Sequence, residues 1–308
     1  MRIQHKPLLI AGALALTLAA SGCTTVDTPS AAGGPSDQAS PVAAALTVNV
    51  EARALVPAKI LDAGELKIAS DPTYPPFEYF DTDNKTMIGW DVDMGNAIAA
   101  VLGLKAVHVP ATFDTILPGL TSHKYDLGMS AFSVTPERAK AVDFVPYLDS
   151  GTGLAITPGN PHKLAMDSSS LCGYGVAAQK GSTQSMDVLP KLSKGCTDAG
   201  KKAINIQNFP TQTDANLALT SGRVNAVMAD SVSLAYQGKL AEGRFELADG
   251  PDYEPQLTGT ALDKGSDLLP AIQAATKLVA ESPAMAQINA RWGMPASTAI
   301  TVDKIVMK

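Results

Sequence analysis

The 308-residue sequence has few cysteines, few aromatic residues and no surplus of positive charge. Its formal net charge at pH 7 is −6, and no stretch gathers lysine and arginine into the basic surface that nucleic-acid binding requires. The 4 histidines are scattered without the spacing of metal ligands, and the sequence has no zinc motif, nucleophile elbow or phosphate-binding loop. We therefore expect neither a nucleic acid, a metal nor a cofactor as a partner.

Long apolar runs are missing too, except near the start of the chain. Residues 8–20 are apolar, basic residues precede them, and Ala-Ser-Gly-Cys follows. This three-part pattern is typical of an export signal, and its apolar part is too short for a comfortable membrane span. The ending resembles the lipobox of bacterial lipoproteins, which predicts a signal peptide over residues 1–23 and lipidation of Cys23. The alternative is an ordinary cleaved signal in which Cys23 has no role.

The next segment is poor in large apolar residues. Residues 24 to 45 are mainly Thr, Ser, Pro, Gly and Ala, which cannot bury a core, and we expect a flexible tether over residues 24–54. The rest, about 250 residues, is more than one small core usually serves and predicts two lobes.

Only two cysteines remain once Cys23 is set aside. Cys172 and Cys196 lie in a chain that we expect to be exported to an oxidising space, so we predict a disulfide between them. Closing this loop would stabilise the fold by about 3 kcal/mol. The alternative is a pair of unlinked, buried thiols.

A helix, a turn and a strand occur twice along the chain. Residues 121–129 (TSHKYDLGM) and 220–228 (TSGRVNAVM) each follow a helical pattern and each end in a short apolar strand. The repetition predicts two similarly built α/β lobes, each with a mostly parallel sheet flanked by helices. Chance similarity between two short segments is the alternative.

Polar side chains follow the expected strands of both lobes. The carboxyl ends of parallel strands meet at one edge of a sheet, and ligands bind beyond that edge. We therefore expect these side chains to meet in one site. They are Asp71, Tyr74, Ser130, Ser133, Arg138, Gly181, Ser182, Thr183 and Asp230.

Arg138 stands where a helix start disfavours a cation. Thr135 and Pro136 are typical of the first positions of a helix, whose N–H groups already carry partial positive charge. A bound anion explains the arginine, whereas a surface ion pair is the alternative. A carboxylate held by Arg138 and by N–H groups near Thr183, with an ammonium held by Asp230, predicts a zwitterionic ligand.

The order and spacing of five motifs resemble the bacterial extracellular solute-binding proteins of family 3, the amino-acid-binding components of ABC importers. The motifs are DPTYPPFEY, GWDVDM, SVTPERAKAVDF, QKGST and LTSGRVNAVMAD. The resemblance implies a type II periplasmic-binding fold, in which two α/β lobes joined by a two-strand hinge close over one amino acid. We expect lobe 1 over residues 55–155, lobe 2 over 156–255, and a return to lobe 1 with a C-terminal tail over 256–308.

The resemblance also implies partners and residue roles. We expect an extracytoplasmic monomer, lipid-anchored to the outer face of the cell membrane, that binds an amino acid and serves an ABC transporter permease. The resemblance implies that Arg138 binds the carboxylate of the ligand and that Asp230 binds its ammonium group. The remaining expected contacts are Asp71, Tyr74, Phe77, Phe113, Ser130, Ala131, Ser133, Gly181, Ser182 and Thr183. Ala131 replaces a serine that relatives binding basic amino acids often have.

The ligand's side chain is expected to be polar, and two interpretations of Asp71 differ on its charge. Asp71 and Glu78 flank Tyr74, which favours a cationic side chain held by cation–π and ion-pair contacts. Alternatively, Asp71 forms a local turn before Pro72 and does not contact the ligand, whose side chain is then neutral and polar.

Two further functions remain open at this point. A dehydratase-like enzyme on the same fold would need a positioned acid or base, and Glu78 or His108 could be nominated, although neither has a partner that the sequence reveals. A sensory lipoprotein that never feeds a permease is the other. Asp91 and Asp93 look functional, but we expect them to cap and solvate a helix start.

Overall fold

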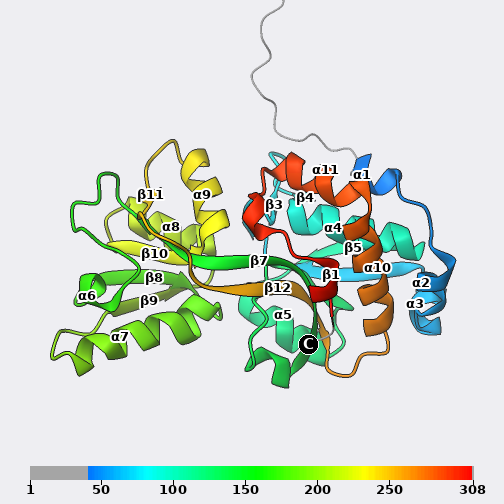
Figure 1. Ribbon diagram of the computed structural model, residues 1–308, viewed down its shortest axis with the longest axis horizontal. Coiled ribbons are helices and arrows are strands. Elements are labelled where there is room, and N and C mark those ends of the chain that lie inside the picture. The colour runs from blue at the N-terminus through cyan, green and yellow to red at the C-terminus, as the bar shows by residue number, and fades with distance from the viewer. Residues whose placement is uncertain (1–40, 307–308) are drawn as a thin grey trace, which may run out of the picture. The chain divides into compact units, whose positions relative to one another are not determined.

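The computed structural model describes residues 41–306. Figure 1 shows two groups of helices and strands joined by two long strands. The predicted signal peptide, Cys23 and residues 24–40 of the predicted tether lie outside the described residues. Between residues 41 and 306, no helix is long and apolar enough to cross a membrane.

Lobe 1 is built on parallel strands in the order β5-β1-β6, and its core contains the fully buried side chains of Leu66, Ile68, Met94 and Ile98. Its strands are β1 (Glu65–Ser70), β5 (Lys105–Pro110) and β6 (Leu127–Gly128), beside a small sheet of β2 (Thr73–Tyr74), β3 (Glu78–Phe80) and β4 (Met87–Ile88). Its helices include α3 (Ala58–Ala63), α4 (Trp90–Leu102), α5 (Phe113–Thr121), η1 (Arg138–Lys140), α10 (Leu269–Glu281), α11 (Pro283–Trp292), η3 (Ala296–Thr298) and η4 (Val302–Lys304).

Lobe 2 repeats this plan with the parallel order β10-β8-β9. Its strands are β8 (Gly175–Gln179), β9 (Asn205–Phe209), β10 (Ala226–Asp230) and β11 (Glu246–Leu247). Its helices are α6 (Ser168–Leu171), the π-helix η2 (Gln184–Val188), α7 (Leu189–Asp198), α8 (Gln212–Thr220) and α9 (Ser231–Leu240). The predicted disulfide between Cys172 and Cys196 is confirmed, and it joins the end of α6 to α7.

Two long antiparallel strands connect the lobes. β7 (Val142–Ile156) pairs with β12 (Tyr253–Asp263) along its first part and with β10 from Thr152 onward. Through them, the described strands outside the small sheet form one nine-stranded sheet in the order β5-β1-β6-β12-β7-β10-β8-β9, with β11 beside β7. The predicted two-lobed, mostly parallel α/β fold with two connecting strands is confirmed. We did not predict that the sheets of the lobes are continuous.

The chain joins lobe 1 earlier than the sequence indicates. Residues 41–54, assigned above to the tether, include α1 (Pro41–Ala44) and α2 (Val50–Ala54). The side chain of Asn49 caps α2, and Arg53 donates to the carbonyls of Leu102 and Gly103, at 2.7 and 2.8 Å. These bonds satisfy carbonyl groups that the end of α4 leaves without an intrahelical partner, so a segment of small residues becomes ordered.

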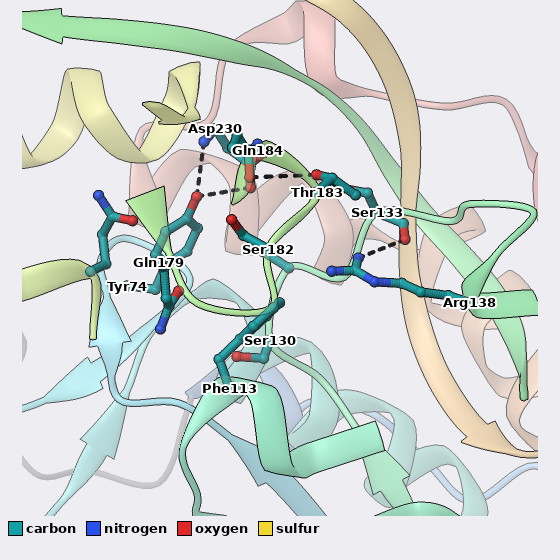
Figure 2. A pocket seen from close by; sticks show the side chains of 12 residues that line it. Tyr74, Phe113, Ser130, Ser133, Arg138, Gln179, Ser182, Thr183, Gln184 and Asp230 are labelled. Atoms are coloured by element: carbon teal, nitrogen blue, oxygen red, sulfur yellow. Dashed lines mark hydrogen bonds between the residues drawn. The ribbon is translucent and has the colours of Figure 1, made fainter. Parts of the chain in front are cut away.

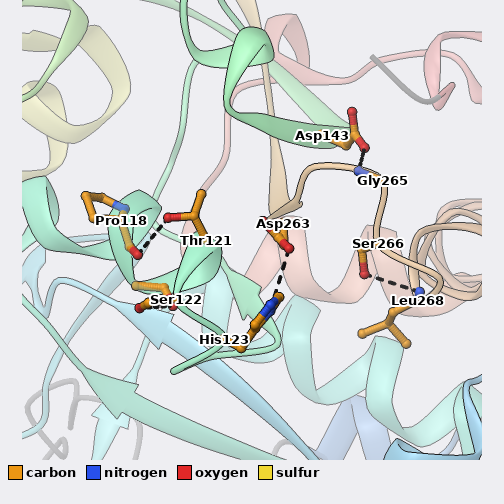
Figure 3. Close-up of polar contacts among 10 residues, drawn as sticks. Pro118, Thr121, Ser122, His123, Asp143, Asp263, Gly265, Ser266 and Leu268 are labelled. Carbon is orange, nitrogen blue, oxygen red and sulfur yellow. Dashed lines mark hydrogen bonds and ion pairs between the residues drawn. The ribbon is translucent and has the colours of Figure 1, made fainter.

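The repeated unit is present in both lobes. α5 and α8 each end at the threonine that opens the repeat, and β6 and β10 follow. In lobe 1 the turn lies beside the end of β12, because His123 Nδ1 is 3.6 Å from Asp263 Oδ2 (Figure 3). The repetition therefore reflects the same local structure twice rather than chance.

Candidate functional site

A pocket lies between residues of the two lobes, and the space between its atoms, including its opening to solvent, is about 310 Å³ (Figure 2). Lobe 1 lines it with Tyr74, Phe113, Ser130, Ala131, Ser133 and Arg138, and lobe 2 with Gln179, Ser182, Thr183, Gln184, Gln212 and Asp230. Of the residues predicted to bind the ligand, all but Asp71, Phe77 and Gly181 line this pocket.

Arg138 forms the positive end of the pocket. Its Nη1 donates to the carbonyl of Ser133 at 2.9 Å, and its Nη2 donates to the carbonyl of Gly181 in lobe 2 at 3.1 Å. The guanidinium also faces the rings of Phe113 and Phe132, at 5.6 and 5.4 Å from the centroids. Burial lowers the pKa of Arg138 to about 10, partly offset by Asp230, so it stays charged at neutral pH. Arg138 N donates to Thr135 Oγ1 at 3.2 Å, but the helix that follows is only the 3₁₀ helix η1, whose N-cap is Glu137 rather than the predicted Thr135.

The loop after β8 faces Arg138 from lobe 2. Thr183 Oγ1 lies 3.4 Å from Ser133 Oγ across the pocket. Gly181 has φ +81°, and a Cβ there would lie 2.9 Å from the Cβ of Asp114 in lobe 1. Gly181 therefore permits the loop to approach lobe 1, and we had predicted a ligand contact instead.

Asp230 forms the negative end. Its carboxylate accepts from Tyr74 Oη at 3.1 Å and from Gln184 Nε2 at 3.3 Å, and its backbone N–H donates to Tyr74 Oη at 2.9 Å (Figure 2). Burial raises the pKa of Asp230 to about 6, and a positive ligand group beside it would lower that pKa. Tyr74 thus bonds Asp230 across the two lobes, in addition to lining the pocket.

Asp71 lies behind the pocket wall. Its carboxylate accepts from Thr73 Oγ1, Phe113 N and Gln179 Nε2, at 2.9, 2.9 and 2.8 Å, and only 2% of the residue is exposed. Burial raises the pKa of Asp71, and these hydrogen bonds lower it. The geometry matches the local-turn interpretation, and it adds a contact with lobe 2 that we did not predict. Phe77 is also behind the wall, fully buried and stacked 6.0 Å from Tyr74.

Two buried carboxyl groups lie behind Ser130 and Ala131. Ser130 Oγ donates to Glu78 Oε1 at 2.6 Å, and Ala131 N donates to Asp91 Oδ2 at 2.8 Å. Glu78 Oε2 and Asp91 Oδ1 are buried and have no hydrogen-bond partner among the described residues. Burial and the charge of Asp91 raise the pKa of Glu78 well above its usual value.

The sequence misjudged the role of Asp91 and Asp93. We expected both to cap and solvate the start of α4, but its N-cap is Gly89, without a side-chain cap, and both aspartates are buried. Asp91 instead fixes Ala131, whose φ of +47° is uncommon for a residue other than glycine. Asp93 accepts from Trp292 Nε1 at 2.8 Å and pairs with an arginine of α11.

Three pocket residues escaped the sequence analysis: Gln179, Gln184 and Gln212. Gln179 is the last residue of β8, so the strand-end rule that found the other residues could have found it. Gln184 directly follows Thr183. Gln212 begins α8 three residues after the end of β9, a strand that the sequence analysis did not use, and its burial, with 1% exposed, distinguishes it from a surface glutamine.

Comparison with known proteins identifies the family. The model of the bacterial extracellular solute-binding proteins, family 3, matches residues 66–295. The chain belongs to this family. It is 32% identical over 244 residues to the arginine-binding protein ArgT of Corynebacterium glutamicum, covering 79% of each chain. The resemblance found in the motifs is thereby confirmed.

Solved structures of similar proteins have the same fold. A P235GK mutant of ArgBP from T. maritima superposes with a TM-score of 0.68 at 28% identity, covering 77% of this chain and 98% of the other. An ancestral amino acid-binding protein, AncCDT-1, described as a precursor of cyclohexadienyl dehydratase, gives 0.67 at 29% identity, with 76% and 97% covered.

Proposed function

We propose that this protein binds a free α-amino acid outside the cytoplasm and delivers it to the permease of an ABC transporter. The observation that carries the proposal is the placement of Arg138 and Asp230, from different lobes, on one small pocket. Arg138 suits a carboxylate, for which a guanidinium provides bidentate donors, and Asp230 suits an ammonium. The amino-acid-binding relatives support the same function.

Ligand binding and closure of the lobes are one event in this proposal. Each lobe supplies only half of the partners of a zwitterion, so a ligand that bridges them favours the closed arrangement. Contacts between lobes already surround the pocket, from Tyr74 to Asp230 and from Arg138 to the carbonyl of Gly181. β7 and β12 are the connections at which the lobes would rotate.

Binding without turnover is part of the proposal, although one structural relative is a precursor of an enzyme. Glu78 and His108, the two nominated acid–base groups, do not line the pocket. His108 Nε2 is 3.1 Å from Asn96 Oδ1, and burial lowers the pKa of His108 to about 4. Incubating the protein with amino acids and looking for new products by mass spectrometry tests this point.

The proposed location rests on residues outside the described part of the chain. Lipidation of Cys23 would anchor a monomer to the outer face of the cell membrane, beside its permease. Mass spectrometry of protein produced with its own signal in a bacterial host tests the anchor. An acyl mass on Cys23 supports it, and an unmodified N-terminus contradicts it.

A binding screen with matched ligands tests the function itself. Thermal shift and calorimetry with the twenty amino acids should find one or a few that bind. The N-acetyl derivative and the carboxamide of the best ligand should bind far more weakly, because each removes one charge of the zwitterion. Equal binding of either derivative would show that Arg138 or Asp230 does not hold the expected group.

A further inference from the structure

A chain of buried hydrogen bonds runs from the pocket residue Gln212 to the other lobe. Gln212 Nε2 donates to Asn216 Oδ1 at 2.9 Å, and Asn216 Nδ2 donates to Gln237 Oε1 at 2.6 Å. Gln237 Nε2 donates to Ser233 Oγ at 2.8 Å, and Ser233 Oγ donates to the carbonyl of Pro75 at 2.7 Å. The first four residues belong to α8 and α9 of lobe 2, whereas Pro75 belongs to lobe 1.

The last bond fixes the direction of all the others. The carbonyl of Pro75 only accepts, so the single hydroxyl hydrogen of Ser233 must point to it. Ser233 Oγ then accepts from Gln237, whose amide oxygen faces Asn216, and the same reasoning sets the amide of Gln212. Turning any one amide around would place two donors or two acceptors against each other. Gln212 must therefore donate toward Asn216 and keep its Oε1, which has no partner among the described residues, for the pocket.

Gln179 is oriented in the same sense by a different partner. Its Nε2 donates to Asp71 at 2.8 Å, and two other donors also converge on that carboxylate, which leaves Asp71 as an acceptor only. Gln179 Oε1 thus has no partner among the described residues and can accept from a ligand. Because Gln179 lines the pocket, its free acceptor adds to that of Gln212.

The hydroxyl of Ser130 is committed as well. It donates to Glu78 Oε1 at 2.6 Å and accepts from Asp71 N at 3.1 Å, so only a lone pair remains for a ligand. Three pocket residues from both lobes thus offer hydrogen-bond acceptors: the amide oxygens of Gln212 and Gln179 and a lone pair of Ser130. The second amide hydrogens of the two glutamines are the only donors left on these side chains.

We infer that Gln212, oriented by the chain that ends at Pro75, is a specificity-determining residue, and that with Gln179 and Ser130 it selects an amino acid whose side chain ends in donors only, a guanidinium or an ammonium. The inference rests on the proposed function and adds the substrate class. A side-chain carboxylate would place acceptor against acceptor and leave buried groups unpaired, which is costly. A guanidinium offers five N–H donors and no acceptor, and the buried carboxylate of Asp71 behind Gln179 favours positive charge.

The inference also links selectivity to closure. Pro75 and Ser233 lie on different lobes, so the bond that sets the direction exists only when the lobes meet. Without it, Ser233 is free to donate back toward Gln237, and Gln212 can turn either end of its amide to the ligand. Selectivity should then be lost although the pocket residues are unchanged.

Arginine and citrulline provide the test, because citrulline replaces one guanidinium nitrogen with a carbonyl oxygen at nearly the same shape. Calorimetry should show arginine binding about tenfold or more tighter than citrulline in the parent protein. Gln212→Leu and, independently, Ser233→Ala should move this ratio most of the way to one. Ser170→Ala is the matched control, since Ser170 also donates to a backbone carbonyl, at 3.0 Å, but lies on α6 outside the pocket, and it should keep the ratio.

The outcomes separate this inference from the function on which it rests. If free amino acids bind but citrulline or glutamine equals arginine, or if both variants keep the parental ratio, the inference is wrong and the function stands. If no free amino acid binds, both are wrong. Loss of folding in Gln212→Leu leaves Ser233→Ala, which touches no pocket residue directly, to decide.

Discussion

Lobe 1 and lobe 2 fix the polar groups of the pocket with different chemistry. Lobe 1 uses buried carboxyl groups: Asp71 holds Gln179, Glu78 holds Ser130, and Asp91 holds Ala131. Lobe 2 uses a chain of neutral amides and a hydroxyl that ends at a backbone carbonyl of lobe 1. In both arrangements a hydrogen bond to a protein partner fixes the orientation of a polar group, and this determines which of its atoms faces the ligand. Only the first arrangement titrates, so pH should distinguish the two halves of the site.

The largest expected effect comes from the charged end in lobe 1. Arg138→Ala should weaken amino-acid binding by about 3–5 kcal/mol, because the ligand carboxylate would be buried without its main partner. Calorimetry with the best ligand measures the change. Lys140→Ala is the control, since Lys140 pairs with Glu137 at the exposed surface and should bind as the parent does. Binding of Arg138→Ala within threefold of the parent would disprove the clamp.

The charged end in lobe 2 should behave differently in the free protein. Asp230→Asn should weaken binding by about 2–3 kcal/mol through loss of the ammonium partner. The unliganded variant should nevertheless be at least as stable as the parent at pH 7. The reason is that the pKa of Asp230, raised to about 6, means that ionising this buried group costs stability. Chemical denaturation without ligand checks the second part, and a marked loss of stability there would contradict it.

The carboxyl groups of lobe 1 predict a pH dependence of stability. Burial raises the pKa of Asp91 from 3.8 to about 6, and the charge of Asp230 adds to it. The folded protein therefore holds this proton more tightly than the unfolded chain, and stability should rise as the pH falls from about 7 towards 4. Asp91→Asn has no such proton. Its free energy of unfolding, relative to that of the parent, should therefore increase by about 1–2 kcal/mol as the pH rises from 4 to 7.

Lobe 2 supplies the contrast for this measurement. Gln237→Leu breaks the amide chain, which contains no titratable residue, so its loss of stability should be the same at every pH. Denaturation curves of the parent and both variants across pH 4 to 7 make the comparison. A flat difference for Asp91→Asn, or a sloping one for Gln237→Leu, would show that the two lobes are not distinguished in this way.

The smallest effect is expected at the rim of the pocket. Lys180 of lobe 2 pairs with Asp114 of lobe 1 at 2.8 Å, and their side chains are 65% and 23% exposed. An exposed ion pair contributes little, so Lys180→Met should weaken binding by about 0.5 kcal/mol, and less at high salt. Calorimetry at two salt concentrations measures it. A loss comparable to that of Arg138→Ala would mean that closure depends on the rim rather than on the buried ends.

The residues of the site that the sequence predicted have a charge or a position along the chain that is informative by itself. Arg138 was found because a cation is unfavourable at a helix start, and Asp230 because it follows a predicted strand. The disulfide followed from two cysteines in an exported chain. The two lobes followed from the repeated helix, turn and strand. Each of these inferences needs only neighbours in the sequence or a count of residues.

What the sequence could not predict depends on burial and on distant partners. Gln212 is uncharged, so its position in the sequence shows nothing unusual. Its proposed role depends on a chain of hydrogen bonds that ends at Pro75 in the other lobe. Asp91 lies in the first turn of α4, where an exposed aspartate is common, and only its burial beside Glu78 shows a different role. Asp71 was judged by its neighbours in the sequence, whereas Gln179, which bonds it from lobe 2, lies far along the chain.

The order of the connections makes lobe 2 a cassette within the gene. The chain leaves lobe 1 along β7 and returns along β12, while α1 near one end of the described chain contacts α11 near the other. One uninterrupted stretch between these strands therefore encodes the whole amide chain from Gln212 to Gln237. Recombination with a relative at β7 and β12 would exchange that half of the recognition chemistry in a single step, without altering the acidic residues of lobe 1. New ligand preferences are thus accessible to this architecture by exchange of one segment, before any point mutation refines them.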